Sequence, residues 1–251
     1  MSEITVGQFD LVGNFFSFAI AAMGAATAFL WLNRSQVSKK YRPAITISGL
    51  VTFIALYHYL RIYESSNGAY SVVDGELVKS ATGLFNNAYR YVDWLLTVPR
   101  LLIELILVMG LSKAATTSKA VRLGSLAAIM VILGYPGEIS DASGTRWLWW
   151  SLSMIPFLWI VFELFSGLKA SVASQPESAR GLVNSARWLV ILSWAFYPIV
   201  FVFPMLGLSG GAATTAVEVG YSIADVVAKA VFGILIYMIA VRKSEADGTT
   251  A

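Results

Sequence analysis

Asp93, Thr97 and Glu104 are spaced so that one face of a helix would carry all three side chains. Their offsets of 0, 4 and 11 residues keep them within about 40° of one another at about 100° per residue. The two carboxyl groups would then lie about 16 Å apart along the helix axis, which is too far for a shared proton or for the carboxylate pair of a retaining glycosidase. Two carboxyl groups at different depths, with a hydroxyl between them, favour stepwise proton transfer instead.

Asp225 and Lys229 are four residues apart and would also share a helix face. A simple ion pair within the helix is one interpretation. The other interpretation is chemical, because apolar surroundings favour the neutral amine of a lysine, and this nucleophilic form makes a Schiff base with an aldehyde. The protonated Schiff base would be a buried cation, and Asp225 and Asp93 would be its anionic partners.

Large aromatic side chains occur in the same apolar stretches. Packing of the core is the usual explanation of such residues. Together they would also form walls around a flat, elongated apolar ligand. They are Trp94, Trp149, Trp150, Trp194 and Tyr197.

The composition predicts that a membrane surrounds these residues. The chain of 251 residues is 57% hydrophobic and 13% charged, against about half and a quarter in soluble domains, and its mean hydropathy is +0.68. We therefore expect an all-α membrane protein, a single seven-transmembrane-helix domain over residues 1–251. Seven apolar stretches are long enough to cross about 30 Å of hydrocarbon: 8–32, 43–63, 88–111, 118–137, 146–168, 183–206 and 214–241.

Basic residues predict the orientation of these spans. Of the 18 Lys and Arg residues, 12 lie in the first, third and fifth connections, at the span ends beside them, or in the C-terminal tail. These segments should be cytoplasmic, and an odd number of spans then places the N-terminus outside and the C-terminus in the cytoplasm. The residues are Arg34, Lys39, Lys40, Arg42, Lys113, Lys119, Arg122, Lys169, Arg180, Arg187, Arg242 and Lys243.

Two further signals lie outside the spans. Tyr70–Val73 and Glu76–Lys79 flank the dipeptide Asp74-Gly75, a pattern that is typical of a small β-hairpin. No basic residue precedes the first apolar stretch, so we expect a retained first span and no cleavable secretory signal.

The ionisable composition argues against several kinds of site. The absence of cysteine excludes disulfides, thiolate metal sites and cysteine nucleophiles. His58 is the one histidine, so we expect no histidine-clustered metal centre. The net charge of +3 comes without a long basic run, which gives no indication of nucleic acid binding.

Ionisable residues inside the predicted spans are the main functional candidates. A central charge costs about 2.5–3.5 kcal/mol on membrane insertion. Structural pairing between helices is the alternative explanation, but several of the charges are concentrated on two spans. The deepest are Asp93, Arg100, Glu104, Asp225 and Lys229, and those nearer to span ends are Arg90, His58, Arg61, Glu163 and Glu218.

Several motifs together resemble those of a microbial rhodopsin, along all seven spans. Residues 90–99, RYVDWLLTVP, continuing to Glu104, closely resemble the third helix of the proteorhodopsin and xanthorhodopsin type of proton pump. Residues 225–229, DVVAK, resemble the seventh-helix motif that carries retinal, and residues 194–198, WAFYP, resemble the sixth-helix motif under the polyene. Residues 134–138 and 146–150 resemble parts of the fourth and fifth helices.

The resemblance implies a role for each matching ionisable residue. Lys229 would hold all-trans retinal as a protonated Schiff base. Asp93 would be the primary counterion and proton acceptor, and Asp225 the second counterion, with Arg90 on its extracellular side. Glu104 would be the cytoplasmic donor that returns a proton to the Schiff base.

Other positions refine this expectation. His58 resembles the histidine that pairs with the acceptor in proteorhodopsins, and its alternative is a packed core histidine. Asp93, Thr97 and Glu104 resemble the pattern of outward proton pumps, and an anionic Asp93 would repel chloride. Leu101 resembles the colour-tuning residue of green-absorbing variants. By the same resemblance the residues that line retinal would be Trp94, Leu101, Met130, Gly134, Trp150, Trp194 and Tyr197.

Two residues depart from the family pattern. Trp150 stands where carotenoid-binding xanthorhodopsins have a glycine, which argues against a carotenoid antenna. Arg100 stands at a usually apolar position four residues before Glu104. It would pair with Glu104, extend to a membrane boundary, or meet a neighbouring protomer.

These observations predict a light-driven outward proton pump of the inner (plasma) membrane, an ion transporter and not an enzyme. A retinal photosensor that signals to a membrane partner is the alternative, since it would share the same retinal site. A retinal-independent transporter is a third class, which visible absorption would exclude. Protons, the lipid bilayer and further copies of the chain in a homo-oligomer are the expected partners.

Overall fold

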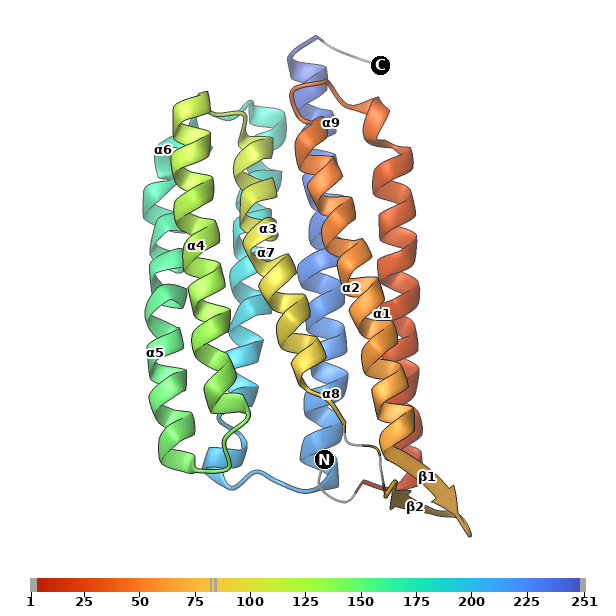
Figure 1. Cartoon of the computed structure of the whole chain (residues 1–251). Coiled ribbons are helices and arrows are strands. Elements are labelled where there is room, and N and C mark those ends of the chain that lie inside the picture. The colour runs from red at the N-terminus through yellow and green to blue at the C-terminus, as the bar shows by residue number, and fades with distance from the viewer. Residues whose placement is uncertain (1–3, 82, 84, 249–251) are drawn as a thin grey trace.

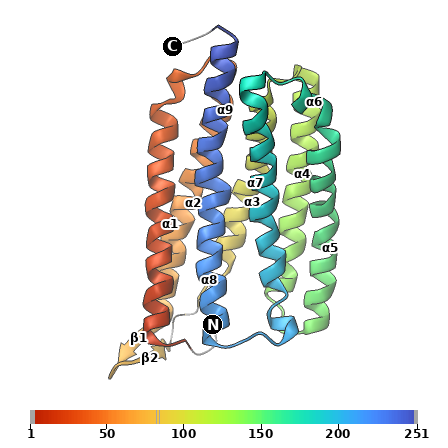
Figure 2. The same cartoon turned by 180° about the vertical axis from the view of Figure 1, so that it is seen from behind.

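The long helices lie side by side in one bundle (Figures 1 and 2). The computed structural model describes residues 4–81, 83 and 85–248. The helices are α1 (Val6–Leu32), α2 (Arg42–Ala69), α3 (Ala88–Met109), α4 (Lys113–Glu138), α5 (Ser143–Phe162), α6 (Lys169–Ala173), α7 (Glu177–Phe201), α8 (Gly211–Asp225) and α9 (Phe232–Ala246), with short 3-10 turns at Arg34–Gln36 and Pro204–Leu206.

Two π-helical segments join helices into continuous rods. The first, Glu163–Gly167, joins α5 to α6, and the second, Val226–Val231, joins α8 to α9. Each of the seven predicted spans lies mainly on one helix or one such rod in the described part of the chain, although 88–111 and 183–206 run past the ends of α3 and α7. The second π-helical segment contains Lys229, and such segments often occur at functional sites.

A β-hairpin marks one end of the bundle. Strands β1 (Tyr70–Val73) and β2 (Glu76–Lys79) pair antiparallel, with Val73 opposite Glu76. Asp74 and Gly75 both have positive φ, 52° and 82°, as the tight turn of a two-residue hairpin requires. The predicted hairpin is therefore confirmed. We call this the hairpin end, and the opposite end, where α9 finishes, the C-terminal end (Figure 1).

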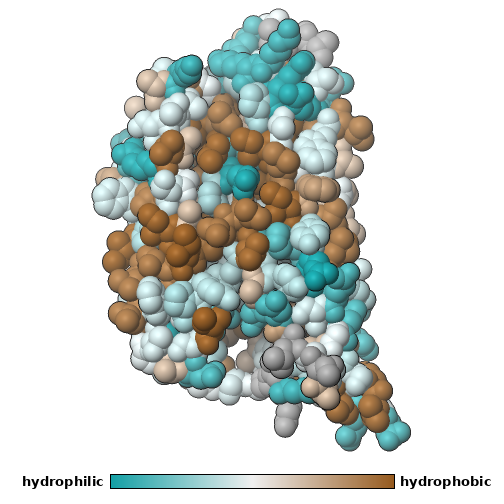
Figure 3. Space-filling model, viewed as in Figure 1, coloured by the Kyte–Doolittle hydropathy of each residue, from teal (hydrophilic) through white to brown (hydrophobic). Residues whose placement is uncertain are grey.

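The surface between the two ends is apolar. Figure 3 shows a brown band across the helices with hydrophilic residues above and below it, and large apolar side chains such as Leu148, Trp159 and Leu192 are exposed. Among the described residues, five helical segments are long and apolar enough to cross a membrane: α1, α2, α4, Ser143–Gly167 and Gly211–Ala246. The α3 helix does not meet this criterion because it carries four charged residues, Arg90, Asp93, Arg100 and Glu104.

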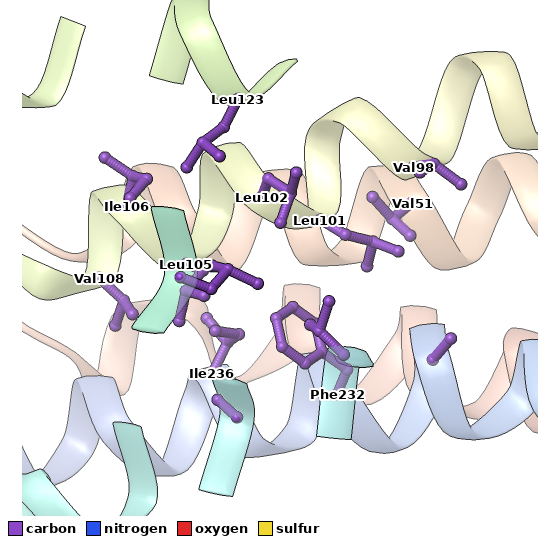
Figure 4. Packing of buried hydrophobic residues seen from close by; sticks show 14 of the residues in the cluster. Val51, Val98, Leu101, Leu102, Leu105, Ile106, Val108, Leu123, Phe232 and Ile236 are labelled. Atoms are coloured by element: carbon purple, nitrogen blue, oxygen red, sulfur yellow. The ribbon is translucent and has the colours of Figure 1, made fainter. Parts of the chain in front are cut away.

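A compact apolar core fills the half of the bundle near the C-terminal end. Figure 4 shows Leu101 and Leu105 of α3 pointing toward Phe232 and Ile236 of α9, with Leu123 of α4 at the top of the view. All five are almost fully buried. Such packing excludes water from the region around α3 between Thr97 and Met109.

Candidate functional site

Lys229 lies between two carboxylates at the centre of the bundle. Its Nζ is 2.5 Å from Asp93 Oδ2 and 3.0 Å from Asp225 Oδ1. All three residues are at most 1% exposed. The structure thus brings together the three residues that the motifs of α3 and the last rod singled out, and the Lys229 ammonium has two anionic partners in place of water.

Asp225 is held by donors from four helical segments. It accepts hydrogen bonds from Tyr59 Oη (2.8 Å) on α2, Trp94 Nε1 (3.3 Å) on α3 and Tyr197 Oη (2.6 Å) on α7, in addition to its contact with Lys229. Hydrogen bonds of this kind stabilise the charged form of a carboxyl group. Asp225 therefore has donors on both of its carboxyl oxygens.

Asp93 has fewer partners than Asp225. Its Oδ2 accepts from Lys229, while the buried Oδ1 has no hydrogen bond within the described part of the chain. His58 Nδ1 lies 3.9 Å from Oδ1, too far for a hydrogen bond, and is 2.9 Å from the Ile54 carbonyl oxygen. Because a carbonyl oxygen only accepts, this geometry requires His58 Nδ1 to carry a proton. Asp93 therefore has an oxygen free to bind a proton.

Thr97 lies between Asp93 and Glu104 but does not connect them. It is fully buried, and its hydroxyl donates to the Asp93 main-chain carbonyl at 2.8 Å. The predicted stripe on α3 is therefore present, with a gap in hydrogen bonding between the two carboxyl groups.

Glu104 is fully buried and isolated. Neither of its carboxyl oxygens has a hydrogen bond among the residues that the structure describes. The nearby polar group is the Ser48 hydroxyl of α2, which itself donates to the Ala44 carbonyl at 3.1 Å.

Arg100 does not pair with Glu104. It is partly exposed on α3, and its guanidinium donates to the main-chain carbonyl of Leu96. No ion pair of Arg100 occurs in the described part of the chain. The structure therefore does not show the pairing with Glu104, and the other two interpretations given above stay predictions.

Arg90 and Glu218 form a buried ion pair on the hairpin side of Asp93. Arg90 Nη2 is 2.7 Å from Glu218 Oε2, and the guanidinium lies over the Tyr221 ring at 4.6 Å. Arg90 is one helical turn from Asp93, so this pair is the next charged layer beyond the Lys229 site.

A second ion pair at the hairpin end was missed by the sequence analysis. Glu138, the last residue of α4, lies 3.8 Å from Arg146 of α5, and Arg146 also stacks on the Phe201 ring. Both residues had been noted only as parts of matching motifs. The i, i+8 spacing across a helix end carries no pattern that would have indicated the pair.

A cavity with aromatic walls lies beside Lys229. The eight residues predicted to contact the cofactor all line it: Trp94, Leu101, Met130, Gly134, Trp150, Trp194, Tyr197 and Lys229. Sequence reasoning missed other lining residues, among them Tyr91, Ser153, Met154, Phe157, Phe201 and Tyr221. Tyr91 lies within the motif of residues 90–99, although no role was predicted for it, and the others carry no motif signal.

The walls of the cavity are fixed by hydrogen bonds between helices. Trp150 Nε1 donates to the Pro198 carbonyl at 3.0 Å, joining α5 to α7, and Ser153 Oγ donates to the Met130 carbonyl at 2.8 Å, joining α5 to α4. An amine at one end and flat apolar walls fit an elongated apolar aldehyde that would attach to Lys229.

Tyr59→Phe should destabilise the bundle through the loss of one donor to Asp225. We expect the free energy of unfolding to fall by about 0.6–1.7 kcal/mol, the range of side-chain hydrogen bonds within membranes. Unfolding in mixed detergent micelles measures this change. Tyr57→Phe is the control, because Tyr57 is 55% exposed on the same helix, and equal stability of the two variants would contradict the prediction.

Comparisons with known proteins show which family this chain resembles in sequence and in fold. A family model described as bacteriorhodopsin-like protein matches residues 10–243. The green-light absorbing proteorhodopsin of gamma-proteobacterium EBAC31A08 is 32% identical over 238 residues, which cover 94% of this chain and 88% of the relative. The solved structure of xanthorhodopsin, described as a light-driven ion pump with dual chromophore, has a TM-score of 0.94 at 48% identity and covers 99% of both chains. A thermophilic rhodopsin has a TM-score of 0.93 at 42% identity and the same coverage.

Proposed function

The chain belongs to the bacteriorhodopsin-like family, and from this we propose that it is a light-driven pump that moves protons outward. It is a microbial rhodopsin of the proteorhodopsin and xanthorhodopsin kind, as its motifs predicted, and a multi-pass protein of the plasma membrane. Its activity is therefore ion transport and not enzymatic conversion.

All-trans retinal is the chromophore of this proposal, attached at Lys229 Nζ. The residues present fit it, because the cavity has a lysine amine at one end, apolar aromatic walls along its length and two carboxylates beside the amine. When bound, retinal supplies absorption of visible light and a light-driven change of shape. The chain's own side chains hold and move the proton.

Asp93 accepts the proton held at Lys229 Nζ in this scheme. Its Oδ2 is already 2.5 Å from the nitrogen, and its Oδ1 has no competing bond in the described chain. Asp225, which four donors hold as an anion, stays the fixed counterion. The summed charge of the amine and the two carboxylates is the same before and after the transfer, so the step buries no additional net charge.

Arg90 and Glu218 control the path beyond Asp93. Neutralisation of Asp93 weakens its attraction for the Arg90 guanidinium, which lies one turn away. Glu218, ion-paired with Arg90 at 2.7 Å, is the candidate group that receives the proton from Asp93 and passes it on toward the hairpin end.

Glu104 returns a proton to Lys229 Nζ from the opposite side. Its isolation in an apolar core suits a carboxyl group that is protonated at rest. About 16 Å of helix axis separates it from Asp93, so the transfer requires that the packing in this half of the bundle opens transiently to water. Pro198 within α7 and the π-helical segment around Lys229 provide points at which the helices can bend.

The asymmetry between Asp93 and Glu104 is the observation that carries the proposal. One side of Lys229 has a charged acceptor followed by an ion pair, and the other side has an isolated carboxyl group. Most basic residues lie at or near the C-terminal end, so that end is taken as cytoplasmic. The proton is then donated from the cytoplasmic side and released outside. A photosensor would need no such donor, which favours the pump.

Trp150 also bears on the chromophores that can bind. Its side chain occupies the cavity wall and is fixed to Pro198. We therefore propose that retinal acts here without a carotenoid antenna at this wall, although the similar xanthorhodopsin is described with a dual chromophore.

Glu104→Gln tests the proposed donor. In this variant, light-induced proton transfer from Lys229 to Asp93 should keep its normal rate. The later return of a proton to Lys229 should slow by about 100-fold, the usual loss for an acid–base group. Azide should partly restore the rate, because a small acid can deliver protons through water. Flash photolysis at visible and near-ultraviolet wavelengths measures each step.

The matched control for this test is Glu177→Gln. Glu177 is exposed at the start of α7, on the same side of Lys229 as Glu104. Its photocycle should be that of the wild type. An unchanged photocycle in Glu104→Gln would remove Glu104 from the donor role.

A further inference from the structure

Lys243 of α9 is a buried cation without an acidic partner in the described part of the chain. The residue is 4% exposed, and its Nζ donates to the Met109 main-chain carbonyl and to Gln175 Oε1, both at 2.6 Å. Its charge also lies 5.0 Å from the centre of the Tyr41 ring. The charges of Asp247 and Lys40 also act on it, but from beyond ion-pair distance. A buried lysine whose direct hydrogen-bond partners are neutral is costly, so its retention requires an explanation that the proton path above does not give.

The Lys243 contacts join three separate parts of the bundle. Met109 is the last residue of α3, and Gly110 ends that helix in a left-handed conformation with φ of 63°. Gln175 lies in the connection between α6 and α7, and its Nε2 also donates to the Met109 carbonyl at 3.2 Å. A cation at the C-terminus of α3 interacts favourably with the helix dipole. Lys243 of α9 and Gln175 of the α6–α7 connection therefore both donate to the Met109 carbonyl at the end of α3, and they also contact each other.

Tyr41, just before α2, also packs against Lys243. Its ring is fully buried, and its hydroxyl donates to Asp247 at 2.8 Å. Burial and the Asp247 carboxylate raise the pKa of Tyr41 above its ordinary value, so the hydroxyl remains a donor. The start of α2 and the end of α9 are thereby held together around the same ammonium.

This cluster lies between Glu104 and the C-terminal end. Met109 follows Glu104 by five residues on α3, which is about 7.5 Å along the helix axis. A proton that enters from the C-terminal end to recharge Glu104 must therefore pass the level of the Lys243 ammonium. The ammonium closes this route in two ways, since it bridges the helix ends and its charge repels an incoming proton.

We propose that Lys243 is a positioning residue that fastens the ends of α3 and the α6–α7 connection over Glu104, and that this fastening must be released before Glu104 takes up a proton from the cytoplasm. The inference rests on the proposed function, in which Glu104 is the donor. The contacts of Lys243 would be a second barrier to proton uptake by Glu104, in addition to the apolar core around that residue.

The test compares K243M with the wild type by flash photolysis with a soluble pH-indicator dye. Methionine keeps most of the side-chain length but has neither the charge nor the donors. Proton uptake should become about threefold to tenfold faster, as expected for the loss of a membrane hydrogen bond. The earlier proton transfer from Lys229 to Asp93 should keep its rate, and a merely structural role would not produce this difference between the two steps.

Two variants serve as controls. K243R keeps the charge and the donors, and it should retain the slow uptake. K39M removes an exposed lysine of the α1–α2 connection, and it should leave uptake unchanged. If K243M does not bind retinal, Q175L replaces it, because this variant removes the side-chain acceptor of Lys243. Unchanged uptake in K243M, or an equal acceleration in K39M, would overturn the proposal.

A dark measurement separates this inference from the proposed function. Amide hydrogen exchange without illumination should be faster in K243M at residues 110–113 and 175–178, and unchanged in K39M. Faster exchange in a protein that does not acidify its medium would support the fastening and reject the pump. Unchanged exchange together with normal pumping would reject the fastening alone.

Discussion

Lys229→Ala abolishes visible absorption and all light-driven proton movement when the protein is produced with retinal. No other lysine amine lines the cavity within the described residues, and without an amine there the aldehyde has no group to which it can attach. The loss is expected to be complete. The absorption spectrum of the purified protein and the pH of illuminated cells measure it.

The alanine variant has a second effect that must be separated from the first. It leaves Asp93 and Asp225 buried and 1% exposed without the cation between them, which is destabilising. Lys229→Arg is the matched variant, because it keeps a cation but forms no stable imine. Both variants should be colourless, and the arginine variant should unfold at a higher detergent concentration than the alanine variant.

Lys169→Ala is the neutral control for these variants, since Lys169 is exposed at the start of α6. It should keep the colour and the pumping of the wild type. Visible absorption in Lys229→Ala, sensitive to hydroxylamine, would show that retinal attaches elsewhere.

Asp93→Asn should stop proton transfer from Lys229 while the protein still binds retinal. The amide cannot accept the proton, so the near-ultraviolet intermediate of the photocycle should fall by about 100-fold or more. Loss of one of two carboxylates beside the cation should also move the absorption maximum to longer wavelength. Flash photolysis and the dark spectrum record both changes.

Asp225→Asn is the comparison that tests the difference in roles. Asp225 accepts from Tyr59, Trp94 and Tyr197, so its replacement should reduce stability more than Asp93→Asn does. Proton transfer to Asp93 should remain measurable. Normal pumping by Asp93→Asn, or loss of proton transfer only in Asp225→Asn, would reverse the assignment of acceptor and fixed counterion.

Helical spacing predicted the parts of the site that lie within one element. Asp93, Thr97 and Glu104 share a buried stripe on α3, and Asp225 and Lys229 contact each other across one turn. Such pairs depend only on the period of the helix. The hairpin could also be predicted from the sequence, because Asp74-Gly75 specifies its turn locally.

Contacts between residues far apart in the sequence could not be predicted from helical spacing. Tyr59 is 166 residues from Asp225, and Lys243 is 134 residues from Met109. No periodicity relates such positions, because the rotation of each helix about its axis is set by packing against its neighbours. The resemblance identified the family residues, yet it gave no indication of the cluster around Lys243.

The contacts of Arg100 also could not be predicted from the sequence. Its spacing of four residues from Glu104 is compatible with an ion pair, but its guanidinium turns back to the Leu96 carbonyl. Glu104 is thereby left without a cation, and this isolation suits a proton donor.

Light-induced pH change in intact cells tests the central claim most directly. Cells that contain the protein and retinal should acidify an unbuffered medium on illumination, and a protonophore should abolish the signal in sodium, potassium and chloride salts alike. Alkalinisation, acidification that survives the protonophore, or a signal that depends on one salt would contradict an outward proton pump.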